Sequence, residues 1–197
     1  MKKLKDWVNP VYLKHPAGLK KEFASNKPFP HLILGNFFKA IGPVARALPK
    51  EKFYEHNSDL YQFQQTDDCK NAKQPAVKAF YEFFSSKEFI KFISEITNTK
   101  LKFIDMSGFI YDDTDYLLPH DDRLAGRKIA YILNLTKGFT KADGGALQFF
   151  KKNKIVKSIP PTFNTFTIFK VSPKSLHQVQ EIITKKKRLS FGGWFHG

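Results

Sequence analysis

Apolar and polar positions follow two different periodicities along the chain of 197 residues. Up to about residue 98, after one apolar strand-like segment, "HLILGNFF", the apolar residues recur at helical spacing over 39–48 and again over 76–97. This spacing predicts helices in both segments. The residues of the second segment that we expect in the core are Phe80, Phe83, Phe84, Ile90 and Ile93.

From residue 100 onward the pattern changes to short segments rich in β-branched and aromatic residues, separated by turn residues. We expect strands near 101–110, 115–122, 128–135, 145–150, 154–159, 164–170, 175–181 and 188–195. Eight short strands after a helical lead favour an α+β fold, a double-stranded β-helix or cupin-like jelly roll buttressed by N-terminal helices. Because no linker interrupts the sequence, we expect one domain over 1–197, with a helical lead that includes one or more strands over 1–98 and a jelly-roll core over 99–197.

Composition and cysteine content indicate the compartment. A hydrophobic content of 42% suffices for one core at this length. Cys69 is the only cysteine, so no intramolecular disulfide can form, and we expect a cytoplasmic protein. The N-terminal segment is basic, but no apolar stretch of signal-peptide or transmembrane length follows it, and we expect no membrane association.

The chain is strongly basic, with 33 Lys and Arg against 18 Asp and Glu and a net charge of +15. Lysine clusters occur at 2–5, 151–157 and 185–188. Such a charge suits a polyanionic neighbour such as RNA. A compositional bias towards lysine, phenylalanine, isoleucine and asparagine would produce the same charge without any partner, and charge runs are commonly solvated surfaces. Both explanations stay open.

The segment "DYLLPHDDRL" places two aspartates directly after a histidine within a predicted strand. In an extended strand alternate side chains share a face, so His120 and Asp122 should point the same way and Asp121 the other. Imidazole and carboxylate are both metal ligands. Such a pair also arises by chance, and an ordinary acid on an edge strand is the plainer explanation of this motif alone.

A third candidate ligand, His177 in "SPKSLHQVQ", strengthens the metal hypothesis. Two histidines and one carboxylate form the facial triad that binds non-haem Fe(II) and leaves three coordination positions open. An α-keto acid can chelate two of these positions and dioxygen can take the third, provided that a cation holds the far carboxylate. Arg188 and Ser190, on one face of a predicted strand, offer a guanidinium and a hydroxyl for this carboxylate. Taken singly, each residue also fits a structural role.

Several motifs together resemble one known family. They are "HLILGNFF", "YDDTDYLLPHDD", "GRKIAYILNL", "GGALQFF", "VSPKSLHQV" and "RLSFGGWFHG". Over about residues 29–197 the sequence is similar to the catalytic domain of the Fe(II)/2-oxoglutarate prolyl hydroxylases that act on a decoding-centre protein of the small ribosomal subunit. The resemblance implies iron ligation by His120, Asp122 and His177. It also implies that Arg188 anchors 2-oxoglutarate and that Tyr111 forms a hydrogen bond with this co-substrate.

Other positions of this resemblance concern the walls of the site. Trp194 is similar to an aromatic wall of the substrate pocket, and an apolar core tryptophan is the equally weighted alternative. Asn134, within "LNL", stands where relatives carry a tyrosine, so one co-substrate contact must be remade or lost. Pro119 stands where relatives often have cysteine. Those relatives carry a second jelly-roll domain after "GWFHG", and we expect here a single-domain version.

The resemblance implies a dioxygenase that uses Fe(II), 2-oxoglutarate and dioxygen, with ascorbate as reductant, to hydroxylate a prolyl residue of a small-subunit ribosomal protein. Three alternatives stay open. They are a 2-oxoglutarate oxygenase acting on another protein or on nucleic acid, a catalytically silent basic binding module, and a cupin-like metal protein without 2-oxoglutarate. An intact triad disfavours the second, and Arg188 with Ser190 disfavours the third.

Overall fold

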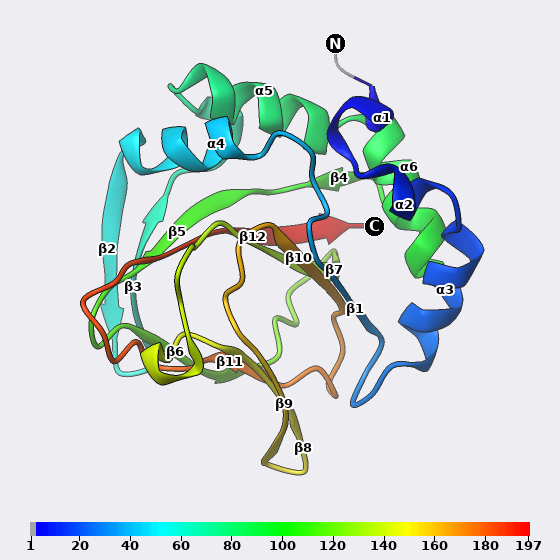
Figure 1. Ribbon diagram of the computed structural model, residues 1–197. Helices are drawn as coiled ribbons and strands as arrows, with labels where there is room; N and C mark the ends of the chain where they lie inside the picture. Colours follow the sequence, from blue (N-terminus) through cyan, green and yellow to red (C-terminus); the bar gives the residue numbers. More distant parts are fainter. Residues whose placement is uncertain (1–2) are drawn as a thin grey trace.

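The computed structural model of the chain describes residues 3–197. In this part of the chain, twelve strands form one curled antiparallel sheet (Figure 1). The strands are β1 (His31–Leu34), β2 (Phe53–Ser58), β3 (Tyr61–Thr66), β4 (Phe103–Ile104), β5 (Ser107–Tyr111), β6 (Tyr116–His120), β7 (Arg127–Asn134), β8 (Leu147–Lys151), β9 (Lys154–Ile159), β10 (Thr165–Lys170), β11 (His177–Val179) and β12 (Arg188–His196). Their order is β1-β10-β7-β12-β5-β3-β6-β11-β8-β9, with β2 paired to β3 and β4 to β12.

Helices cover the outer face of the curled sheet, with α4 and α5 along one side and α1, α2, α3 and α6 beside them (Figure 1). Their bounds are α1 (Leu4–Trp7), α2 (Pro10–Leu13), α3 (Pro16–Ser25), α4 (Gly42–Ala47), α5 (Pro75–Phe84) and α6 (Lys87–Thr97). Short 3₁₀ turns are η1 (Leu48–Lys50), η2 (Cys69–Asn71) and η3 (Lys141–Asp143). None of the helices within residues 3–197 has the length and apolar character needed to cross a membrane.

The helical periodicity over 76–97 is confirmed, but the segment forms two helices. The chain turns at Ser85 and Ser86, and the Ser86 hydroxyl accepts the backbone N–H of Phe89 at 3.3 Å, which caps the start of α6. A left-handed residue, Asn98, ends α6 with φ of 49°. The five residues expected in the core, Phe80, Phe83, Phe84, Ile90 and Ile93, are all buried. They pack between the helices and the outer face of the sheet.

The jelly-roll prediction is confirmed, and each of the eight predicted segments contains a strand. The segment 101–110 is not one strand, because β4 and β5 are separated at Asp105 and Met106. The helix expected over 39–48 is shorter, with α4 beginning only at Gly42 and followed by η1. The hairpin of β2 and β3 was not predicted.

Successive side chains of β12 point to opposite faces of the curled sheet, one toward the apolar core and the other toward the concave side. Leu189, Phe191 and Phe195 face the helices and join the main apolar core. Arg188, Ser190 and Trp194, at alternate positions of the same strand, line a cavity on the opposite, concave side. One strand therefore supplies both the packing that holds the sheet and the polar groups of the interior.

Candidate active site

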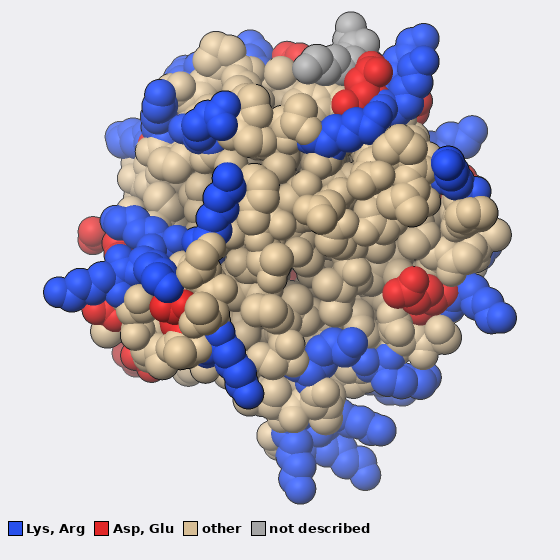
Figure 2. All heavy atoms as spheres, viewed as in Figure 1, with Lys and Arg blue, Asp and Glu red and all other residues tan. Residues whose placement is uncertain are grey.

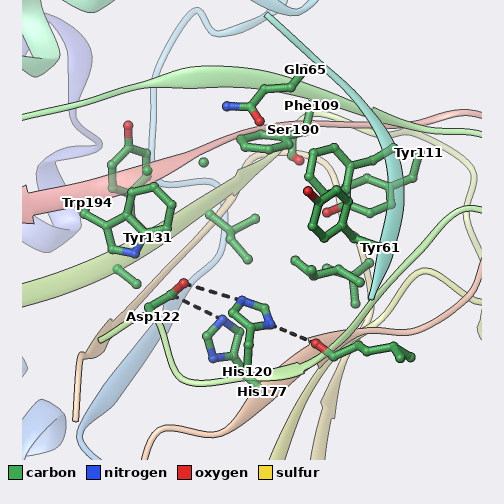
Figure 3. A pocket seen from close by; sticks show the side chains of 18 of the residues that line it. Tyr61, Gln65, Phe109, Tyr111, His120, Asp122, Tyr131, His177, Ser190 and Trp194 are labelled. Carbon is green, nitrogen blue, oxygen red and sulfur yellow. Dashed lines mark hydrogen bonds and ion pairs between the residues drawn. The ribbon is translucent and has the colours of Figure 1, made fainter. Parts of the chain in front are cut away.

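A cavity of about 420 Å³ opens on the concave side of the sheet (Figure 3). Its walls are mainly apolar and aromatic. Two groups of polar side chains interrupt them, one where β6 meets β11 and one at the start of β12. The lining includes Leu60, Tyr61, Phe63, Tyr111, Leu118, Pro119, His120, Asp122, Arg127, His177, Arg188, Ser190 and Trp194.

The three predicted metal ligands converge at the first of these places. His120 ends β6 and His177 begins β11, and the antiparallel register pairs the two residues directly. Potential ligand atoms of His120, Asp122 and His177 all lie within 4.8 Å of one another. The Asp122 carboxylate lies 3.4 Å from Nε2 of His120 and 3.3 Å from Nε2 of His177 (Figure 3). Two imidazoles and one carboxylate are the donor set of a facial triad.

The local cause of this convergence differs from the predicted one. Strand β6 ends at His120, so simple alternation along a strand does not extend to Asp122. Asp122 instead has a φ of 60°, a left-handed conformation that aspartate tolerates better than most residues. The chain turns there, and the carboxylate lies against both histidines while Asp121 pairs with Arg123 at 2.8 Å.

Backbone carbonyls fix both imidazole rings in the same way. Nδ1 of His120 lies 2.8 Å from the carbonyl oxygen of Leu118, and Nδ1 of His177 lies 2.8 Å from that of Ser175. With Nδ1 facing these oxygens, Nε2 of each ring faces Asp122 and is the nitrogen available to a metal. This arrangement is typical of histidines that bind a metal through Nε2.

The charges of the three side chains are coupled. Burial alone would raise the pKa of the Asp122 carboxyl, but hydrogen bonds from the two histidines outweigh burial and hold this pKa well below its usual range. Burial lowers the pKa of His120, whereas the contact with Asp122 raises it, and the net direction is upward. The carboxylate is therefore ionised at neutral pH, as a divalent cation requires of a ligand.

The second polar place centres on Arg188, which is only 1% exposed. Its Nη1 donates to the Ser190 hydroxyl at 3.4 Å, and the guanidinium lies 5.0 Å from the centre of the Tyr111 ring. Nε and Nη2 have no hydrogen-bond partner within residues 3–197, and no carboxylate of this part of the chain pairs with the guanidinium. Burial lowers the pKa of Arg188. A buried cation with unused donors fits an anionic ligand.

The remaining predicted residues fall into two groups. Tyr111 lines the cavity, and burial raises the pKa of its hydroxyl well above the usual value, so the phenol is neutral and able to donate. Trp194 also lines the cavity, with the guanidinium of Arg127 stacked 3.2 Å from its ring centre. Asn134 is buried opposite Ser190 in the paired strands, but it does not line the cavity.

The sequence analysis missed one wall of the cavity. Leu60, Tyr61 and Phe63 come from the β2–β3 hairpin, which pairs with β5 and β6 beside the cavity. Alternating aromatic residues in "YQFQQT" were the available strand signal. Arg127 was also missed, although it begins the strand that follows the histidine–aspartate motif.

Comparisons with known proteins agree with this geometry. Residues 106–196 match the 2OG-Fe(II) oxygenase superfamily. The chain is 40% identical over 181 residues to prolyl 3-hydroxylase OGFOD1 of Xenopus laevis, covering 86% of this chain and 35% of that protein. It is 38% identical over 181 residues to prolyl 3-hydroxylase OGFOD1 of Mus musculus, covering 86% of this chain and 33% of that protein. A solved prolyl hydroxylase from Trichoplax adhaerens, in complex with a peptide fragment of a hypoxia inducible factor, has a TM-score of 0.74 at 14% identity, covering 95% of this chain and 93% of that one.

Residues 106–196 of the chain are therefore similar to a 2OG-Fe(II) oxygenase domain. Relatives of the chain include two proteins named prolyl 3-hydroxylase OGFOD1, which confirms the resemblance found in the sequence motifs. The chain spans about one third of the length of the relatives it matches. The Trichoplax structure supports the jelly-roll fold.

Proposed function

We propose that this domain hydroxylates a prolyl residue of a protein, with a small-subunit ribosomal protein as the favoured substrate. The observation that carries the proposal is the combination, in one cavity, of a three-donor metal set with a buried guanidinium that lacks an anion. The homologues named prolyl 3-hydroxylase support the reaction type. The ribosomal substrate and the use of ascorbate rest on the motif resemblance, and the proposed cytoplasmic location rests on the single cysteine.

The residues present fit the implied cofactors. His120, Asp122 and His177 would hold Fe(II), and Arg188 with Ser190 would hold the far carboxylate of 2-oxoglutarate. Bound Fe(II), 2-oxoglutarate and dioxygen together supply an oxidation that inserts one oxygen atom into a C–H bond and yields succinate and carbon dioxide. The unused Nε and Nη2 of Arg188 would favour a dicarboxylate, because a ligand without a second carboxylate would leave them unpaired.

The chain's own contribution is binding, orientation and exclusion of water. The neutral Tyr111 hydroxyl is placed to donate to the co-substrate rather than to accept from it. A co-substrate contact of Asn134 stays a prediction. Apolar groups such as Phe63 would keep water from the reacting carbon, and Trp194, with Arg127 stacked on one face of its ring, adds an aromatic wall suited to a proline ring. Arg127, stacked on this indole, is placed to donate to a peptide carbonyl.

Mass spectrometry tests the proposal directly. Proline-containing peptides of small-subunit ribosomal proteins are incubated with the domain, Fe(II), ascorbate and 2-oxoglutarate. We expect the added mass of one oxygen atom on one proline, with a matching yield of succinate. Asp122→Ala should abolish both products. Asp121→Ala is the matched control, because it removes the neighbouring carboxylate, which pairs with Arg123 rather than with the histidines.

Two results would contradict the proposal. Succinate formation driven by RNA or by proline-free peptides would indicate a different substrate class. Tight binding of the peptides without any succinate, in a metal-loaded protein, would indicate a binding module.

A further inference from the structure

A basic hairpin projects from one end of the sheet. Strands β8 and β9 form it, and the residues Lys151, Lys152, Lys154 and Lys157 lie in it (Figure 1). Lys152 and Asn153 at its turn have φ values of 48° and 61°, which is typical of a tight two-residue hairpin turn. Lysine and arginine side chains are gathered at this protruding end in the space-filling view (Figure 2).

The segment that contains the hairpin has a larger excess of positive charge than the chain as a whole. Residues 144–180 contain six lysines and no Asp or Glu, although the complete chain has 18 acidic residues. The two lysines of this segment outside the hairpin are Lys170 and Lys174, and Lys174 lies in the loop whose Leu176 carbonyl accepts the N–H of Phe150 of β8. None of the six side chains forms an ion pair within the part of the chain that is described.

Apolar side chains accompany these charges. Ile155 and Val156 of β9 are 49% and 50% exposed. Strand β9 is the last strand of the sheet, with β8 as its neighbour on one side. The hairpin thus presents unpaired lysines and exposed aliphatic groups on a projecting, well-defined edge.

The hairpin is connected directly to the candidate metal site. Phe149 of β8 pairs with His177 of β11, and the basic residues begin two positions further along β8 at Lys151. At roughly 3.3 Å per residue, the lysines begin about 7 Å beyond the pairing at the metal ligand. A polyanion bound to the hairpin would therefore lie close to the candidate metal site.

We infer that the β8–β9 hairpin is an RNA-binding surface that contacts the phosphate backbone beside the protein substrate. The placement of RNA next to the substrate rests on the proposed ribosomal function. Lysines suit phosphates as flexible point charges, and the hairpin tip has no aromatic residue for base stacking, so the contact is to the backbone and not sequence-specific. Lysines on an edge strand also discourage strand-to-strand association, and this role requires no RNA.

The test uses two charge-reversed variants with the same change of net charge. Lys152→Glu with Lys154→Glu alters the hairpin, and Lys20→Glu with Lys21→Glu alters exposed residues of α3, away from the hairpin (Figure 1). Binding of a short fluorescein-labelled RNA is measured by anisotropy over a range of salt concentrations. We expect the hairpin variant to lose about tenfold or more in affinity at 0.1 M salt and to show a salt slope lower by roughly 1–2, because two phosphate contacts are lost. The α3 variant should retain most of the affinity.

Several outcomes would overturn the inference. Equal losses in both variants would mean that only net charge matters. Unchanged RNA binding in the hairpin variant would mean that these lysines serve only to discourage strand-to-strand association at the sheet edge. Poly-glutamate that binds the wild type as tightly as RNA, with the same loss in the hairpin variant, would indicate an acidic protein partner.

Hydroxylation of a short prolyl peptide by the same preparations separates this inference from the proposed function. We expect both variants to retain wild-type turnover of the peptide, because neither pair of lysines lines the cavity. If no peptide were hydroxylated while hairpin-dependent RNA binding persisted, the proposed activity would fail and the RNA-binding surface would stand.

Discussion

Replacing Arg188 should change the stability of the fold and the affinity for 2-oxoglutarate in opposite directions. In the ligand-free chain the guanidinium is 1% exposed, and it faces no carboxylate within residues 3–197. Arg188→Met keeps most of the side-chain volume and removes the charge. By analogy with buried ionic groups replaced by hydrophobic ones, we expect the free energy of unfolding of the ligand-free protein to rise by about 1–4 kcal/mol.

The same substitution should remove most of the 2-oxoglutarate affinity. A buried charge-assisted pair that loses one partner costs about 2–5 kcal/mol, which corresponds to roughly 30-fold to several-thousand-fold in Kd. Arg188→Lys should restore the affinity only partly, because an ammonium cannot reproduce the two parallel hydrogen bonds of a guanidinium. Metal affinity should change little, since the guanidinium is not among the three side chains that converge on the metal site.

Titration calorimetry of the manganese-loaded protein measures the co-substrate affinity without turnover, and thermal unfolding with and without 2-oxoglutarate measures the stability. Lys187→Met is the matched control, because it removes an adjacent cation that is exposed and paired with Asp112. The assignment of Arg188 as the anchor would be refuted by equal 2-oxoglutarate affinities in wild type and Arg188→Met. A destabilised ligand-free Arg188→Met would refute the view that the unpaired charge is costly.

Three further predictions concern other parts of the structure. Asp122→Ala should abolish stoichiometric binding of Mn(II), measured by electron paramagnetic resonance, whereas binding that survives would exclude this carboxylate as a ligand. Asp105 accepts the backbone N–H of Trp194 at 2.9 Å and lies 2.7 Å from His196, so Asp105→Ala should raise KM for a prolyl peptide several-fold more than it lowers kcat. Asp105→Asn should retain much of the wild-type KM, and equal effects of the two variants would contradict this positioning role. Burial raises the pKa of Cys69 to about 12, so a thiol reagent at pH 8 should label it only after unfolding, and rapid labelling of the native protein would disprove its burial.

The second half of the fold was predictable because its strands are strongly apolar and regularly punctuated. Five of the six residues of β10 and six of the nine residues of β12 are buried, and the sequence pattern is correspondingly clear. The β2–β3 hairpin was missed because β2 is largely exposed on both faces and β3 is only half-buried, so neither strand shows a strong alternation. Its pairing with β5 and β6 depends on tertiary contacts that a local pattern does not contain.

The metal ligands of the candidate site could be predicted, because their side-chain types are characteristic of metal ligands. His120, Asp122 and His177 were found from ligand type and chain order, and the structure brings them together. The left-handed backbone conformation of Asp122 was not predicted. Aspartate tolerates this conformation, but its presence in the sequence does not by itself indicate it. The stacking of Arg127 on Trp194 could not be predicted from the sequence either, because β7 and β12 become neighbours only through the sheet topology.

The segment "GGWFHG" shows how one motif can serve packing and site at once. A side chain at Gly193 would collide with the backbone carbonyl of Asp105, so this glycine allows the close approach of β12 to the break between β4 and β5. Asp105 in turn binds the N–H of the next residue, Trp194, whose ring lines the cavity. Phe195 then faces the helical core, and His196 pairs with the same aspartate. The backbone around Trp194 is thus held by Asp105 and by the packing of Phe195, and this fixes the place of the indole in the cavity wall.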